Sequence, residues 1–82
     1  MRMNHESARD YLIPTNEFNG RHASYRRQSL TVVRGKRVVH GPHFPNTDII
    51  GDVIARGKRG AEYRCYVYKS GHITALYSIE TI

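Results

Sequence analysis

The chain has 82 residues, enough for one domain (1–82) with a small core, but not for a catalytic domain beside a recognition domain. Thirteen Lys and Arg residues against seven Asp and Glu give a net charge of +6, which favours a polyanionic partner: nucleic acid or an acidic protein surface. The single cysteine, Cys65, excludes an internal disulfide, and no apolar run predicts a signal peptide or a membrane span. We therefore expect a cytoplasmic protein with no membrane contact.

The N-terminal part predicts a short helix followed by a loop. Asn4 is a suitable helix N-cap, Glu6 suits the positive end of the helix dipole, and Pro14 ends the helical stretch. These signals predict a helix over residues 4–13. Residues 14–24, PTNEFNGRHAS, are rich in turn-forming residues and predict a loop.

From residue 25 to residue 82 the pattern is that of β-strands. Five segments are rich in β-branched and aromatic residues: SYRRQSLTVV, KRVVH, TDIIGDVIA, AEYRCYVYK and HITALYSIETI. Gly51, inside the third segment, predicts a bulge or bend. Short links between the segments predict a five-stranded antiparallel meander. The fold class is thus mainly β, or α+β if the helix packs on the sheet, and the meander curls into an SH3-like barrel or a bent sheet.

The last two segments form a hairpin whose register the apolar pattern selects. A two-residue loop at Ser70 and Gly71 leaves both faces mixed, whereas a three-residue loop pairs Tyr68 with His72 and puts Gly71 at its left-handed position. In the second register, which we adopt, one face is nearly all apolar: Ala61, Tyr63, Cys65, Val67, Ile73, Ala75, Tyr77 and Ile79. The other face collects Glu62, Arg64, Tyr66, Tyr68, His72, Thr74 and Ser78.

The segment YRCYVYKSGHITALYSI (63–79) resembles the terminal hairpin of RelE-type ribonuclease toxins in its rhythm of Tyr, Arg and aliphatic residues around a glycine turn. The resemblance covers about a fifth of the chain. Such toxins carry a helical hairpin upstream that this sequence lacks, so we do not assign the chain to that family.

The tetrapeptide RGKR occurs twice, at residues 34–37 and 56–59. In the predicted meander each copy forms a turn, and both turns lie at the same end of the sheet. Their cations, with Arg26 and Arg27 nearby, are then placed to straddle a phosphate backbone or an acidic groove. The alternative is that Gly with Lys or Arg is simply good turn chemistry with solvated charges. The predicted binding residues are Arg26, Arg27, Arg34, Lys36, Arg37, Arg56, Lys58 and Arg59.

The polar face of the last hairpin is a second candidate site. It presents Arg64, Tyr66, Tyr68 and His72, and both Tyr and Arg are typical of binding hot spots. Tyrosine rings also stack on bases. The alternative places Tyr66 and Tyr68 in the core, beneath the N-terminal helix.

The remaining motifs predict neither a metal, a cofactor nor a catalytic group. His40 and His43 are spaced three apart, but a metal site needs three or four ligands. A ribonuclease would use His with Lys, Arg or Tyr as general acid and base, and the candidates are His40, His43 and His72. The histidines are present, but their spacing in the sequence does not support that role.

Three functions follow from the sequence, in order of preference. The first is a small non-catalytic basic module that binds nucleic acid or a nucleoprotein complex through the two RGKR turns. The alternative is an inhibitor or modulator of the phage or mobile-element type, which binds a host enzyme or defence complex by protein contact. The third is a small ribonuclease toxin. An edge strand of so small a sheet also predicts a possible homodimer.

Overall fold

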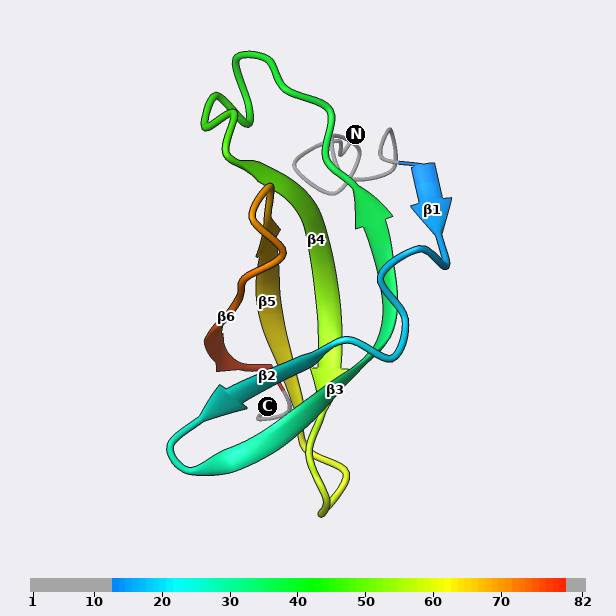
Figure 1. Cartoon of the computed structure of the whole chain (residues 1–82), viewed down its shortest axis with the longest axis vertical. Helices are drawn as coiled ribbons and strands as arrows, with labels where there is room; N and C mark the ends of the chain where they lie inside the picture. The colour runs from blue at the N-terminus through cyan, green and yellow to red at the C-terminus, as the bar shows by residue number, and fades with distance from the viewer. Residues whose placement is uncertain (1–12, 80–82) are drawn as a thin grey trace, which may run out of the picture.

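The computed structural model describes residues 13–79, and all regular structure in that range is β-strand (Figure 1). The strands are β1 (Ile13–Thr15), β2 (His22–Tyr25), β3 (Gln28–Arg37), β4 (Ile49–Arg56), β5 (Glu62–Tyr68) and β6 (Ile73–Ser78). All pairings are antiparallel, in the order β1-β3-β4-β5-β6, with β2 also paired to β3.

The sheet curls because β3 is long and serves several neighbours. One edge of β3 pairs with β4, while the other pairs with β2 along its first half and with β1 along its last residues. β2 then crosses toward β6, so the two ends of the sheet nearly meet (Figure 1). The predicted fold class, a small antiparallel sheet curled toward a barrel, is confirmed. The curl encloses the core, whose fully buried large side chains are Phe18, Leu30, Val32, Val53, Val67 and Cys65.

The N-terminal boundaries differ from the prediction. The helix predicted over residues 4–13 lies outside the described residues except at Ile13, where β1 begins. The loop predicted over residues 14–24 instead holds most of β1 and the start of β2. Between these strands Phe18 is completely buried, and its ring fills the space where a Cβ on Gly51 would lie, 2.6 Å from Cε2. The turn-rich segment therefore contributes Phe18 to the core. Its two short strands, β1 and β2, form because they pair with β3.

The first RGKR (34–37) is not a turn. It forms the last four residues of β3, where Gly35 pairs with Val53 and Arg37 pairs with Gly51. A Cβ on Gly35 would lie 2.5 Å from Cγ1 of Val53, so this glycine permits close packing between strands. β3 therefore covers most of the first predicted strand and only the first two residues of the second, and β1 and β2 raise the count to six.

Arg26 and Arg27, predicted inside the first strand, instead form the two-residue turn between β2 and β3. Tyr25 pairs with Gln28 across this turn. Both arginines have positive φ, 51° and 69° respectively. Arginine does not favour that conformation, so no local sequence signal marks this hairpin.

The predicted register of the last hairpin is confirmed at its tip. The Tyr68 amide donates to the His72 carbonyl at 2.8 Å, and Gly71 has a φ of 91°. Further along, Cys65 pairs with Ala75 but Arg64 pairs with Tyr77, which leaves Leu76 as an extra residue in a bulge on β6.

The bulge reverses the alternation of side chains along the rest of β6. Tyr77 and Ile79 are therefore 47% and 37% exposed, and their predicted place on the apolar face is wrong. The bulge predicted at Gly51 is confirmed, because the β4–β5 register shifts between Ile49 and Gly51.

Candidate functional site

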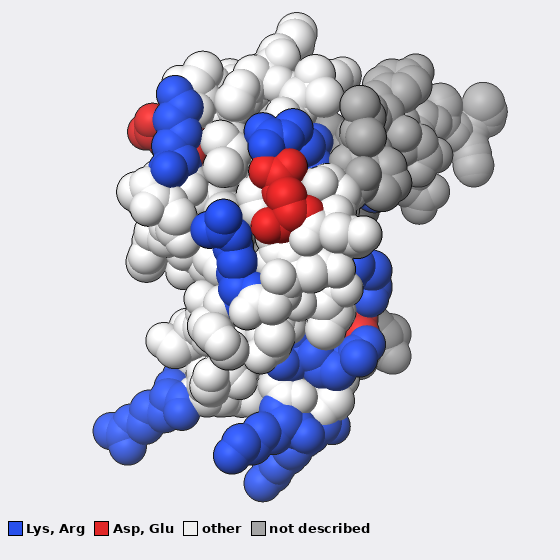
Figure 2. Space-filling view, turned by 45° about the vertical axis from the view of Figure 1, so that its right-hand side comes forward, with Lys and Arg blue, Asp and Glu red and all other residues white. Residues whose placement is uncertain are grey.

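Two cationic turns lie together at one end of the barrel. The β2–β3 turn carries Arg26 and Arg27, and the turn between β4 and β5 carries Lys58 and Arg59. We call these four residues the basic end. Figure 2 shows Lys and Arg side chains gathered at the lower end of the molecule. The two turns line one pocket of about 480 Å³, formed by Arg26, Arg27, Gln28, Ser29, Lys58 and Arg59.

A buried glycine brings the two turns together. A Cβ on Gly57 would lie 2.6 Å from Oε1 of Gln28 and 3.3 Å from Cδ2 of Leu30. The Gln28 side chain is itself held, because its Nε2 donates to the Tyr63 hydroxyl at 3.0 Å. At the other side of the turn, Gly60 has a φ of 88°. The second RGKR (56–59) therefore leads into a turn as predicted, and its glycine sets the approach to β3.

The β2–β3 turn has costly residues at its centre. A two-residue hairpin turn with both central φ values positive favours Asn-Gly, because the left-handed region costs other L-residues about 1–2 kcal/mol each. Here both positions are arginine, with φ values of 51° and 69°. The Arg26 guanidinium lies 5.3 Å from the centre of the Tyr25 ring, which offsets part of that cost. Backbone strain of this kind clusters at functional sites.

Among residues 13–79, three ion pairs involve arginines of the two RGKR copies. Arg34 and Arg56, the first residues of the two RGKR copies, both donate to Glu62, at 3.2 Å and 2.5 Å. The hydrogen bond from Arg56, and to a smaller extent that from Arg34, lowers the pKa of Glu62 below its ordinary value. Arg37 donates to Glu17.

The predicted gathering of both RGKR copies at one end is wrong. Register explains why: Arg37 pairs with Gly51 at the start of β4, whereas Arg56 ends β4 opposite Thr31. The two copies therefore extend in opposite directions along the β3–β4 pair, and their last residues lie at opposite ends of it. Lys36 lies within this ladder, opposite Asp52.

The basic end differs from these paired cations. Within residues 13–79, no ion pair joins Arg26, Arg27, Lys58 or Arg59 to a carboxylate. Gln28 and Ser29 line the same pocket and add neutral hydrogen-bonding groups. Sequence reasoning missed both residues, because the hairpin that places them carries no turn-forming residue.

The predicted partner face divides into two groups. In the first, Arg64 makes two hydrogen bonds to Asp52, at 2.9 Å and 2.7 Å, and one to the Tyr77 hydroxyl at 3.4 Å. The Asp52 carboxylate raises the pKa of Arg64 above its ordinary value. The same guanidinium lies 5.2 Å from the centre of the Tyr66 ring, and the rings of Phe44 and Tyr66 form a T-shaped pair with centres 5.3 Å apart. Arg64 and Tyr66 are therefore ordered by contacts within the protein.

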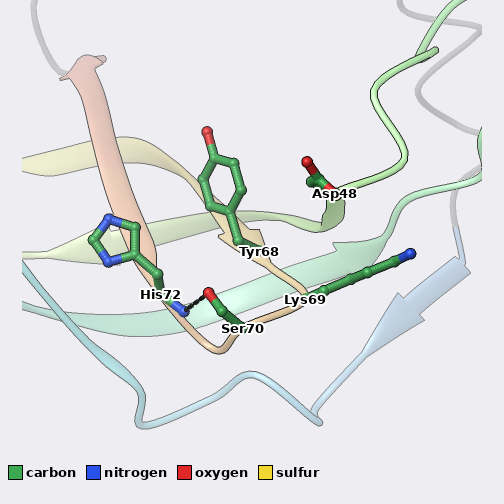
Figure 3. A pocket seen from close by; sticks show the side chains of 5 residues that line it. All are labelled: Asp48, Tyr68, Lys69, Ser70 and His72. Atoms are coloured by element: carbon green, nitrogen blue, oxygen red, sulfur yellow. Dashed lines mark hydrogen bonds between the residues drawn. The ribbon is translucent and has the colours of Figure 1, made fainter.

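The second group is at the β5–β6 tip. The rings of Tyr68 and His72 stand on the same side of the hairpin, 5.9 Å apart, while Lys69 points away from them (Figure 3). The His72 amide donates to Oγ of Ser70 at 3.3 Å. These residues and Asp48 line a pocket of about 380 Å³.

His40 and His43 do not line that pocket. Nε2 of His40 lies 2.7 Å from the Ile49 carbonyl and ties the β3–β4 connection to β4, and His43 is exposed in that connection. Among the described residues, no group of three or more His, Cys, Asp and Glu side chains is arranged to hold a metal ion. The same part of the chain contains no helix with the length and apolar character needed to cross a membrane.

Comparisons of the chain with protein-family profiles, curated proteins and solved structures gave no match. The case for a function therefore rests on the placement of charge and side chains described above.

Proposed function

We propose that the protein is a small non-catalytic module that binds nucleic acid, with the basic end in contact with the phosphate backbone. The observation that carries this proposal is the meeting of two cationic turns around one pocket, with no carboxylate paired to them among residues 13–79. Four cations placed against phosphates release condensed counterions, which drives binding without reading the sequence.

Two further features support the proposal. Ser29 supplies a hydroxyl of the kind that hydrogen-bonds phosphate oxygens beside Arg and Lys. The β2–β3 turn retains two arginines at left-handed positions, where Asn-Gly is the stable choice. Reversal of the chain alone does not account for arginines at these two positions, whereas contact with an anionic ligand does.

The test is the salt dependence of binding to a labelled DNA duplex of mixed sequence. Four phosphate contacts correspond to a slope of log K against log salt of about −3.6. Changing Lys58 to Gln should reduce its magnitude by about 0.9. The matched control is Lys69→Gln, which removes the same charge from the other end of β5 and should leave the slope unchanged. No binding at low salt overturns the proposal.

The proposal also excludes catalysis, which a second measurement checks. An RNA probe incubated with the protein should be recovered intact. Cleavage that disappears in a His72→Ala variant would instead establish the ribonuclease alternative.

A protein-directed modulator is the second candidate, and the ordered outer face of β5 and β6 favours it. Arg64 and Tyr66 are held in place by Asp52 and Phe44, and Tyr77 beside them is 47% exposed. Preorganised Tyr and Arg side chains are typical of binding hot spots. A purified partner that binds after nuclease treatment, and loses affinity in Tyr77→Ser but not in Lys58→Gln, would favour this function over the first.

A further inference from the structure

We infer that the nucleic acid bound at the basic end is double-stranded and is held through its phosphates without base stacking. This inference rests on the proposed function and names the class of ligand for the same site.

The first step is the chemistry of the pocket lining. Proteins that hold single strands combine a basic groove with aromatic side chains, and each stacked base contributes about 1–3 kcal/mol. Among residues 13–79, the lining of the pocket is cationic or neutral polar and contains no ring: Arg26, Arg27, Gln28, Ser29, Lys58 and Arg59. A single strand therefore finds charge at this site but no aromatic ring on which a base can stack.

The second step concerns Tyr25, the aromatic residue next to the β2–β3 turn. Its ring packs against Tyr63 at 5.1 Å between centres and is covered by the Arg26 guanidinium at 5.3 Å. Tyr63 is 8% exposed and belongs to the core. The Tyr25 ring thus serves to anchor the turn and is not free to receive a base.

The third step concerns Tyr77, the exposed tyrosine of β6. Its hydroxyl accepts a hydrogen bond from Arg64, and it is not part of the pocket lining. A single strand that followed the basic end and stacked on Tyr77 would make affinity depend on that ring. The inference therefore predicts that its removal leaves binding unchanged.

The fourth step is the charge density of the ligand. Duplex DNA carries one charge per roughly 1.7 Å of axis, and each neutralised phosphate contributes about 0.9 to the salt slope, against about 0.7 for a single strand. Four contacts then give slopes of about −3.6 and −2.8. With no stacking term for either ligand, the duplex should bind about tenfold more tightly at roughly 50 mM salt, and the difference should shrink as salt rises.

The experiment compares two fluorescein-labelled probes of equal length, a mixed-sequence DNA duplex and oligothymidine, by anisotropy over a range of salt. The wild-type chain is measured beside Tyr77→Ser. The expected result is a duplex preference of about tenfold at roughly 50 mM salt that narrows at higher salt, with neither affinity changed by Tyr77→Ser.

The contrary outcomes are separable. Oligothymidine bound as tightly as the duplex, or bound in a way that Tyr77→Ser weakens, overturns the duplex inference and leaves the proposed function standing. Failure to bind either probe at about 50 mM salt overturns both.

Discussion

Gly57 packs so closely against Gln28 that a Cβ at position 57 would lie 2.6 Å from Oε1 of the glutamine. This contact joins the β4–β5 turn to the first residue of β3, which directly follows the β2–β3 turn. Because Gly57 has no side chain, the two turns can approach closely, which places Lys58 and Arg59 beside Arg26 and Arg27.

Changing Gly57 to Ala should separate the two cationic turns without altering the net charge. We expect a loss of about 1 kcal/mol in the free energy of unfolding, since the methyl group displaces the end of the Gln28 side chain from its hydrogen bond to Tyr63. Affinity for duplex DNA should fall as well. Urea unfolding and anisotropy titration measure the two effects. Gly41→Ala is the control, because nothing lies within 4 Å of a Cβ there; equal behaviour of the two variants would contradict the assigned role of Gly57.

Replacing Arg26 with Asn and Arg27 with Gly should stabilise the fold and weaken binding together. The new residues suit the left-handed positions, so we expect about 1–2 kcal/mol of added stability and a higher Tm. The salt slope for duplex DNA should fall in magnitude by about 1.8, because two phosphate contacts are lost. Thermal unfolding and salt titration provide the measurements.

The control for that variant is Arg21→Gln combined with Lys69→Gln, which removes the same charge outside the basic end. Its salt slope should match the wild type. A double turn variant that gained no stability would show that the left-handed arginines carry no strain.

Changing Glu62 to Gln should release Arg34 and Arg56 and strengthen binding to polyanions. Arg56 is the last residue of β4, directly before the turn that carries Lys58, and Arg34 binds the same carboxylate, so the salt slope should become steeper. Glu17→Gln, which frees Arg37 at the other end of β3, adds the same charge and should leave the slope unchanged. A similar gain in both variants would mean that net charge, and not its position, governs affinity.

The stability of the protein should also depend on Glu62 at acidic pH. Its two arginine partners lower the pKa of Glu62 in the folded state below the ordinary value of 4.5. The pair therefore stabilises the fold above that value, and the contribution disappears as the pH falls through the lowered pKa. Urea unfolding measured over acidic pH should show a weaker decline in Glu62→Gln than in the wild type, and identical curves would contradict the assignment.

At alkaline pH the buried Cys65 should control part of the stability. Burial raises the pKa of this thiol from 9.0 to about 11, so folding favours the neutral form. Its contribution is complete below about pH 9 and is lost as the pH rises through 11, by about 3 kcal/mol. Unfolding curves of Cys65→Ala should decline less over this range. Rapid alkylation of the native thiol at neutral pH would contradict the burial.

Local patterns predicted the hairpin of β5 and β6 well. Tyr63, Cys65 and Val67 alternate with polar residues, and only the three-residue loop brings them to the same face as Ile73, so the register follows from neighbours in the chain. The bulge at Leu76 did not follow, because it accompanies the curvature of the nearly closed sheet. The exposure of Tyr77 on the outer face is therefore a consequence of the bulge, and only the tertiary structure shows it.

The two RGKR copies show where local patterns end. Composition and alternation establish a small basic β domain, because net charge and apolar periodicity belong to the chain alone. Whether four identical residues become strand or turn depends on partners distant in the chain: Gly35 opposes Val53 within a ladder, and Gly57 meets Gln28 across the curl of the sheet. The same long-range pairing sends Arg34 and Arg56 to Glu62 and leaves the basic end to Arg26, Arg27, Lys58 and Arg59. Charge is a property of composition, but its location is a property of packing between residues that no short segment contains.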